Sequence, residues 1–117
     1  MESAVLNKSM NFAVRIVNLY KYLQTEKKEF IMSKQLLRSG TSVGANLREA
    51  KYAQSTDDFI HKNSIALKEI SESEYWLELL YKTEYLSEKE YMDISHDCSE
   101  IARLLTSIVK TTKRNNK

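Results

Sequence analysis

The chain contains no proline and only two glycines in 117 residues. These two residue types supply most tight turns, because glycine tolerates positive φ and proline presets φ. A β-sandwich, barrel or propeller needs many such turns, so the sequence argues against all three. Apolar residues make up 42% of the chain and charged residues 29%, which is typical of a globular domain. The sequence therefore predicts an all-α protein, and its length predicts a single domain over residues 1–117.

Apolar residues recur at helical spacing in four segments. The pattern predicts helices over about residues 5–24, 30–54, 56–82 and 88–112, with a basic tail at 110–117. Ser55 can cap the third helix, and Ser87 and Glu90 have the spacing of a capping box at the start of the fourth. Residues 24–29 are expected to form a solvated connection. Short connections force neighbouring helices antiparallel, so the expected fold is an up-down-up-down four-helix bundle.

Both glycines lie inside the second predicted helix, where each costs about 1 kcal/mol relative to alanine. Gly40 and Gly44 are four residues apart, so they lie on one side of adjacent turns. We interpret them as the site of a close helix crossing. The alternative is a phosphate-binding loop, but that motif requires G-x-x-x-x-G-K-[ST] after a strand, and neither the lysine nor a strand is predicted here.

Charge is distributed unevenly along the chain. Residues 1–54 carry a net charge of +5, residues 55–109 a net charge of −7, and residues 110–117 a net charge of +4. A nearly neutral chain is thus composed of a basic helical hairpin, an acidic helical hairpin and a basic tail.

Seven basic residues are candidates for contact with phosphate. Those in the second predicted helix lie away from its apolar stripe, and the first helix and the tail add the others. They are Arg15, Lys34, Arg38, Arg48, Lys51, Lys113 and Arg114. Such cations bind nucleic acid by displacing its counterions. The competing interpretation is a solvated helix surface, because a pI of about 8.6 is low for a dedicated nucleic-acid-binding domain.

Leu37 is expected to lie on the same side as these cations, together with the small residues Thr41 and Ala45. A monomer would leave this leucine in water. The opposite charges of the two hairpins would favour a head-to-tail contact between copies of the chain, so we expect a homo-oligomer.

Catalytic and metal chemistry find little support. Glu49, Glu69 and Glu72 supply part of a dinuclear carboxylate site, but the Glu-x-x-His pairs of such bundles are missing. Cys98 lies on the predicted inward stripe of the fourth helix, where a thiol acts as a small apolar group. We therefore predict no catalytic residue, no metal and no cofactor. A carboxylate metalloenzyme is the alternative that bound iron or manganese would reveal.

No apolar run approaches the roughly 18 residues of a membrane span, and the start Met1-Glu2-Ser3 does not resemble a signal peptide. The expected location is cytoplasmic, without a membrane partner.

Three consecutive segments of the chain resemble a known family. The central one is QLLRSGTSVGANLREA at residues 35–50; SMNFAVRIVNLYKYL lies before it and DFIHKNSIALKEISESEYWLELL after it. The family comprises bacterial four-helix-bundle proteins related to those encoded in 23S ribosomal RNA intervening sequences. The accessory variability protein of diversity-generating retroelements is similar in type. Family-typical positions are Arg38, Asn46, Glu49, Glu69, Glu72 and Trp76, which we assign to packing or assembly.

The resemblance implies a homopentameric ring, a role in binding nucleic acid and, for the retroelement members, a reverse transcriptase as partner. It implies no enzymatic activity. Together with the charge pattern, it predicts a non-enzymatic oligomeric protein that binds nucleic acid, RNA rather than DNA, through a basic face of the first two helices. The alternative is an assembly or scaffold module that binds other protein chains and no nucleic acid.

Overall fold

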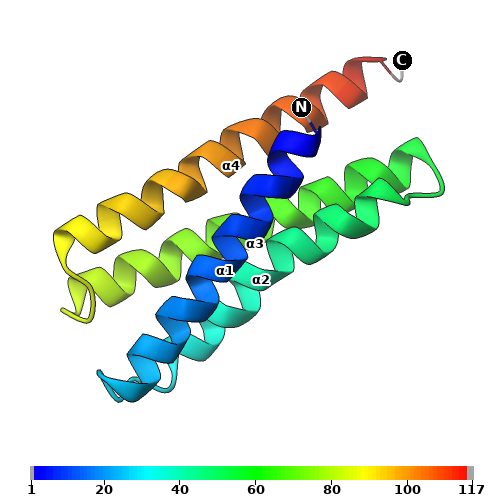
Figure 1. Cartoon of the computed structure of the whole chain (residues 1–117). Helices are drawn as coiled ribbons and strands as arrows, with labels where there is room; N and C mark the ends of the chain where they lie inside the picture. The colour runs from blue at the N-terminus through cyan, green and yellow to red at the C-terminus, as the bar shows by residue number, and fades with distance from the viewer. Residues whose placement is uncertain (1, 116–117) are drawn as a thin grey trace.

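The computed structural model describes residues 2–115, which form four helices and no strand. The helices are α1 (Glu2–Thr25), α2 (Met32–Lys51), α3 (Thr56–Lys82) and α4 (Glu88–Asn115). Successive helices run antiparallel and pack side by side, forming a bundle of 49 × 22 × 19 Å (Figure 1). The predicted up-down-up-down bundle is confirmed. None of the described helices is long and apolar enough to cross a lipid bilayer.

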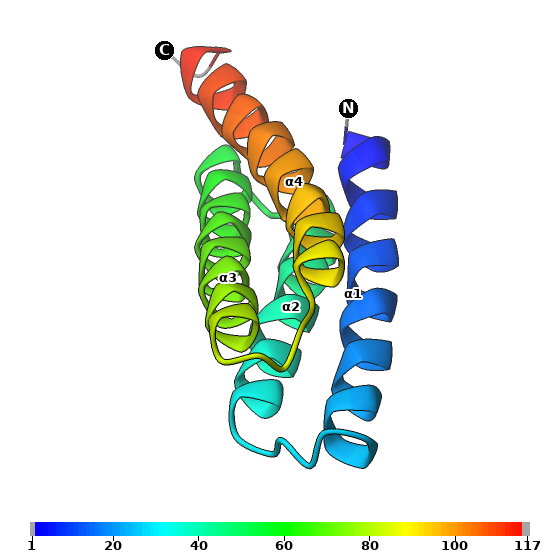
Figure 2. The same ribbon diagram turned by 90° about the vertical axis from the view of Figure 1, so that its left-hand side faces the viewer.

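The bundle is held together unevenly. The contact between α2 and α3 is the most extensive, and α1 touches α4 least. Figure 2 shows α4 lying obliquely to α1. The C-terminal turns of α4 therefore extend from the bundle with one broad face uncovered by other helices, since the last buried residue of α4 is Ile108.

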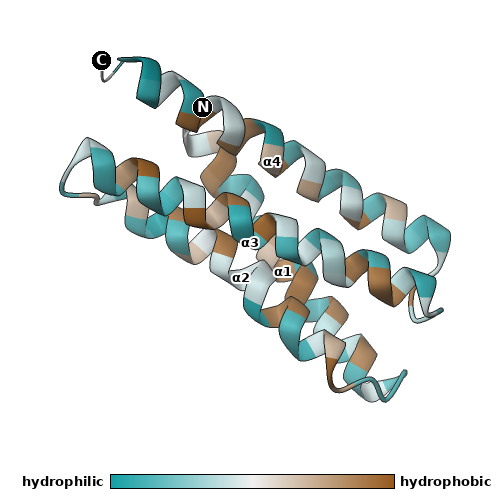
Figure 3. Cartoon of the chain, turned by 180° about the vertical axis from the view of Figure 1, so that it is seen from behind, coloured by the Kyte–Doolittle hydropathy of each residue, from teal (hydrophilic) through white to brown (hydrophobic). Residues whose placement is uncertain are grey.

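The core follows the predicted stripes. Hydrophobic residues recur at intervals along every helix between hydrophilic ones (Figure 3). The buried stripe of α2 contains Leu36, Gly40, Val43, Leu47 and Ala50. That of α4 contains Ile94, Cys98, Ile101, Leu105 and Ile108. Tyr91, one turn before Ile94, is half-buried and stacks on Tyr81 with ring centroids 4.7 Å apart.

The two glycines lie within α2, and the close crossing is confirmed at Gly40. A β-carbon added there would lie 2.8 and 2.9 Å from the two γ-carbons of Ile16 on α1. Real β-carbons do not approach other atoms so closely, so α1 and α2 can pack in this way only without a side chain at residue 40. Gly44 faces Ser9, whose Oγ would be 3.4 Å from the added carbon, an ordinary van der Waals distance.

The start of α2 differs from the prediction. The helix begins at Met32, because the carboxylate of Glu29 accepts hydrogen bonds from the backbone N–H groups of Ile31, Met32 and Ser33 at 2.7–3.1 Å. Glu29 is buried, so assigning it to a solvated connection was wrong. Burial acts to raise the pKa of Glu29, but these hydrogen bonds outweigh it and lower the pKa.

The predicted caps of the other helices are confirmed. Ser55 accepts a hydrogen bond from the N–H of Asp58. At the start of α4, the N–H of Glu90 donates to Ser87 Oγ at 3.1 Å, and the N–H of Ser87 donates to the Glu90 carboxylate at 2.9 Å. This is the reciprocal pattern of a capping box.

Two helix ends differ from the prediction. The second helix stops at Lys51 instead of residue 54, where the N–H groups of Tyr52 and Ala53 bond to carbonyls of the last turn. The fourth helix continues to Asn115, so residues 110–115 of the predicted basic tail are helical. Residues 116–117 lie outside the described residues.

Candidate nucleic-acid interface

The seven cations predicted to contact phosphate do not form one continuous face. Two of them, Arg15 and Arg38, pair with carboxylates of neighbouring helices. The other five are exposed and make no ion pair with the side chains of residues 3–115; they are Lys34, Arg48, Lys51, Lys113 and Arg114.

Arg15 joins α1 to α4. Its guanidinium donates to Asp97 at 2.5 Å and to Asp93 at 2.9 Å. Partial burial acts to lower the pKa of Arg15, but the two carboxylates outweigh it and raise the pKa. Lys8 makes a second link between these helices, to Glu100 at 3.3 Å. Arg15 thus closes the least extensive helix contact of the bundle, and a phosphate would have to compete with two carboxylates for it.

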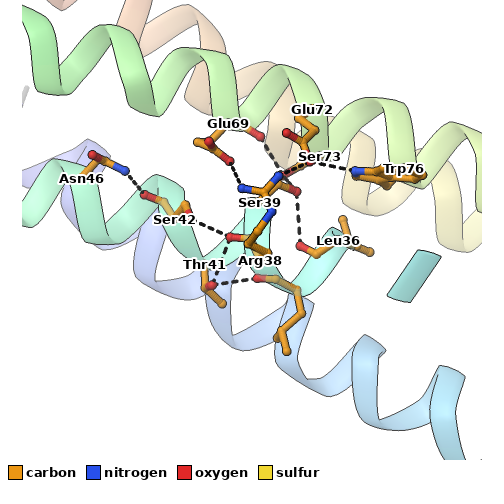
Figure 4. A network of polar contacts seen from close by, with 11 residues as sticks. Leu36, Arg38, Ser39, Thr41, Ser42, Asn46, Glu69, Glu72, Ser73 and Trp76 are labelled. Carbon is orange, nitrogen blue, oxygen red and sulfur yellow. Dashed lines mark hydrogen bonds and ion pairs between the residues drawn. The ribbon is translucent and has the colours of Figure 1, made fainter. Parts of the chain in front are cut away.

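Arg38 joins α2 to α3 in the same way. Figure 4 shows its guanidinium directed at Glu69 and Glu72, and the indole N–H of Trp76 directed at Glu72. The hydrogen bond to Glu72 is the main cause that raises the pKa of Arg38. The pKa of Glu72 is lowered, first by Trp76 and then by Arg38. Beneath this cluster, the buried hydroxyls of Ser39 and Ser73 lie 2.9 Å apart.

The remaining family-typical residues also make polar contacts around α2. Lys62 of α3 donates to Glu49 at 2.8 Å, and the side-chain amide of Asn46 donates to the carbonyl of Ser42 at 2.8 Å. The first contact joins α2 to α3, whereas the second lies within α2.

Leu37 is half-buried and packs against the core. The expectation that a monomer leaves it in water was wrong, because the core residues that it packs against partly cover the side chain. The exposed apolar residues on that side are instead Met10 and Val14 of α1, with 49% and 51% of their surface exposed.

Four of the five unpaired cations lie toward one end of the bundle. Lys51 lines a cavity of about 270 Å³ together with Ser3, Phe59 and Ile108, and the C-terminal ends of α2 and α4 lie at this same end of the bundle (Figure 1). Arg48, Lys113 and Arg114 lie within about two helical turns of these residues along the chain. We call the end of the bundle that holds Lys51 and the C-terminal turns of α4 the terminal end. Lys34 lies at the opposite end of α2, 14 residues or roughly 21 Å from Arg48.

Two further cations, Arg103 and Lys110, are not among the seven predicted from the sequence. Both are exposed, and with Arg114 they line an open hollow of about 670 Å³ on the outer face of α4. Residues 101–115 contain four cations and no carboxylate, whereas residues 88–100 contain five carboxylates and one cation. A signal existed: at about 100° per residue, Arg103, Lys110 and Arg114 lie within roughly 20° of the direction opposite the buried stripe.

Two observations concern metal and thiol chemistry in the described part of the chain. No cluster of three or more His, Cys, Asp or Glu residues there could hold a metal ion. Cys98 is buried, and desolvation raises the pKa of its thiol, with the nearby Glu74 and Asp97 carboxylates adding to the effect. A thiol in that setting is a poor nucleophile.

The fold and these surfaces define an all-helical bundle whose outer faces carry interhelical ion pairs and exposed cations. The sequence model of the 23S rRNA-intervening sequence protein family matches residues 1–107, and the chain belongs to that family. A solved structure of a protein of unknown function from the S23 ribosomal protein family of Bacteroides thetaiotaomicron is 61% identical, covering 93% of this chain and 97% of its own, with a TM-score of 0.92. No curated protein matches the sequence.

Proposed function

We propose that this protein is a non-enzymatic, oligomeric nucleic-acid-binding protein that holds the phosphate backbone of RNA in preference to DNA. The observation that carries the proposal is a set of exposed cations toward the terminal end that form no ion pair with the described side chains, comprising Arg48, Lys51, Lys113 and Arg114. Cations that do not pair with the protein's own carboxylates are available to replace counterions on phosphates. The family name, which refers to 23S rRNA, favours RNA as the ligand.

The proposal excludes Arg15 and Arg38 as principal contacts. Each already binds two carboxylates, and a phosphate that displaced them would leave those carboxylates beside its own negative charge. The predicted basic face is thereby reduced on α2 to Lys34, Arg48 and Lys51, of which the last two lie near the tail cations.

Fluorescence anisotropy with a labelled RNA oligonucleotide tests the proposal. The variant Arg48→Glu with Lys51→Glu is compared with a control, Lys21→Glu with Lys27→Glu, which changes net charge equally at exposed residues. We expect the first variant to weaken binding at low salt and to flatten its salt dependence by about one or two units of log–log slope. If both variants weaken RNA binding equally, net charge alone explains the binding and Arg48 and Lys51 form no specific site. If the native chain does not bind RNA, the proposed function is refuted.

A specific observation also supports self-association. A groove of about 420 Å³ between α1 and α2 is lined by small residues, among them Ala13, Thr41, Gly44 and Ala45, and by the half-exposed Met10; the charged residues Arg48 and Glu49 also line it. We propose that a second copy of the chain occupies it, with its acidic α3–α4 surface on the basic α1–α2 surface. The net charges of +5 in residues 1–54 and −7 in residues 55–109 make the two surfaces complementary.

Light scattering after size-exclusion chromatography tests the assembly. Met10→Lys should shift the protein toward monomer, because it places a charge in the apolar groove. Ile31→Lys is the matched control, since Ile31 is also exposed but lies in the connection between α1 and α2 and does not line the groove. A native chain that is monomeric at high concentration would refute the assembly. Oligomers that dissociate in high salt, together with no salt-dependent RNA binding, would favour the scaffold alternative.

A further inference from the structure

We propose that the outer face of α4 is a track for the phosphodiester backbone of one nucleic-acid strand, formed by Arg103, Ser107, Lys110, Thr111 and Arg114. We call these residues the α4 track. The inference rests on the proposed function and names a site for it that lies outside the basic face predicted on α1 and α2.

First, ion pairing within the bundle does not explain the cations of the α4 track. Glu100 is one turn from Arg103, but its carboxylate bonds to Lys8 at 3.3 Å and lies 3.6 Å from His96. Lys110 has Lys113 and Arg114 at three and four residues, where like charges destabilise a helix by a few tenths of a kcal/mol each. The arrangement therefore opposes folding slightly and gains no ion pair with the side chains described at residues 3–115 in return.

The second argument is that the helix dipole does not account for Arg103. Cations in the last turn of a helix are stabilised by the C-terminal end of the dipole, and this explains Lys113 and Arg114. The effect fades beyond the last turn. Arg103 lies 12 residues before the end of α4, about three turns away, so its position needs another explanation.

The third argument concerns shape and hydrogen bonding. Arg103 and Arg114 are 11 residues apart on a straight helix, about 16 Å, and Lys110 lies between them, about 10 Å from Arg103 and about 6 Å from Arg114 along the axis. Ser107 and Thr111 lie between them in the same open hollow. Their hydroxyls make no side-chain hydrogen bond within the described residues, unlike Thr106, which donates to the carbonyl of Ala102. Serine and threonine hydroxyls are frequent donors to phosphate oxygens.

The residues that line the hollow favour a phosphate backbone over a membrane or another protein as the partner. Its lining contains small residues, hydroxyls and cations, and no aromatic or large aliphatic side chain. A membrane-bound helix inserts such apolar side chains into the lipid, and protein interfaces rely on aromatic and other large anchors. With no aromatic ring to stack on bases, the α4 track should bind every sequence similarly.

The test uses the full-length chain and 20-nucleotide labelled oligo(U) and oligo(A), single-stranded and paired as a duplex. The variant Arg103→Glu with Lys110→Glu is compared with Lys68→Glu and Lys89→Glu, which alters net charge equally at exposed helix residues. We expect the track variant to weaken oligo(U) binding at least about tenfold at low salt and to reduce the salt slope by about 1.4, since two contacts are lost. The control variant should lose much less, and oligo(U) and oligo(A) should bind the native chain with similar affinity.

Different outcomes separate this inference from the proposed function. A native chain that binds RNA, with the track variant binding like the control, would overturn the α4 track and leave the function standing. A native chain that binds neither single strands nor duplex at low salt would refute both. If the track variant loses its oligomeric state together with its binding, the face docks another protein chain and the inference fails. The milder variant Arg103→Gln with Lys110→Gln should keep the native circular dichroism and still weaken binding; normal binding by it would also overturn the inference.

Discussion

Replacing Gly40 with alanine tests the close crossing of α1 and α2 most directly. The added methyl group would lie 2.8 and 2.9 Å from the two γ-carbons of Ile16 and 3.3 Å from its β-carbon. Ile16 is fully buried, and its branched side chain is stiff at χ1, so it cannot rotate away. At Gly44 the nearest atom, Ser9 Oγ, would be 3.4 Å away, so the same substitution there meets no obstacle.

The two substitutions share one energetic contribution and differ in another. In both cases alanine favours the helix by about 1 kcal/mol over glycine. Overpacking a buried contact costs about 1–3 kcal/mol, and this applies only at residue 40. We therefore expect Gly44→Ala to be neutral or stabilising by up to about 1 kcal/mol. Gly40→Ala should be less stable than Gly44→Ala by about 2 kcal/mol, a difference from which the helix propensity cancels.

Urea unfolding followed by far-UV circular dichroism measures this difference. Both variants need the same protein concentration, because self-association adds stability by mass action. In a chain carrying Ile16→Ala, the γ-carbons are gone, so Gly40→Ala should cost much less than in the native chain, with a coupling energy of about 1–2 kcal/mol. The reasoning is refuted if Gly40→Ala unfolds at the same or a higher urea concentration than Gly44→Ala.

Three further predictions follow from the polar contacts. Glu29→Gln should lower the free energy of unfolding by about 1–2 kcal/mol at neutral pH. Because the folded-state pKa of Glu29 is lowered from its ordinary value of 4.5, its stabilisation is present above that pH and lost as the pH falls through the lower folded-state pKa, so urea titrations of variant and native chain should converge in acid. Arg38→Glu places a third carboxylate beside Glu69 and Glu72 and should cost about 0.5–1 kcal/mol; adding Glu72→Arg should restore the urea midpoint, and failure to do so would argue against the pairing. Cys98, whose thiol pKa is raised by burial, should not react with a thiol reagent at about pH 8 until the chain is unfolded; rapid labelling of the native chain would contradict its burial.

The features that could be predicted from the sequence are those that depend on residues close together along the chain. The caps formed by Ser55 and by Ser87 with Glu90 follow from spacing, because donor and acceptor lie three residues apart. The assignment of Gly40 to a crossing follows from the cost of glycine in a helix. Glu29 was misassigned because a carboxylate two to four residues before a helix amide has the same appearance in sequence whether it is solvated or turned inward.

The candidate site was harder to predict, because a helical wheel gives the direction of a side chain and not what lies opposite. Arg15 and Arg38 both point away from their apolar stripes, as the wheel indicated. Their partners Asp97 and Glu72 are 82 and 34 residues away, and only the packing of α4 against α1 and of α3 against α2 brings them within reach. Two of the seven predicted cations therefore serve the bundle, while Arg103 and Lys110 are left facing solvent.

The sequence by itself determined the four amphipathic helices, their antiparallel order and the family. Apolar periodicity, short connections and the sequence motif around Gly40 can all be read from the order of the residues. The tertiary structure decided which charges neutralise one another and which remain open to a partner. The physical reason is range: a helix is specified by contacts three and four residues apart, whereas an ion pair between helices depends on their relative rotation and crossing, which are set by the packing of the whole core.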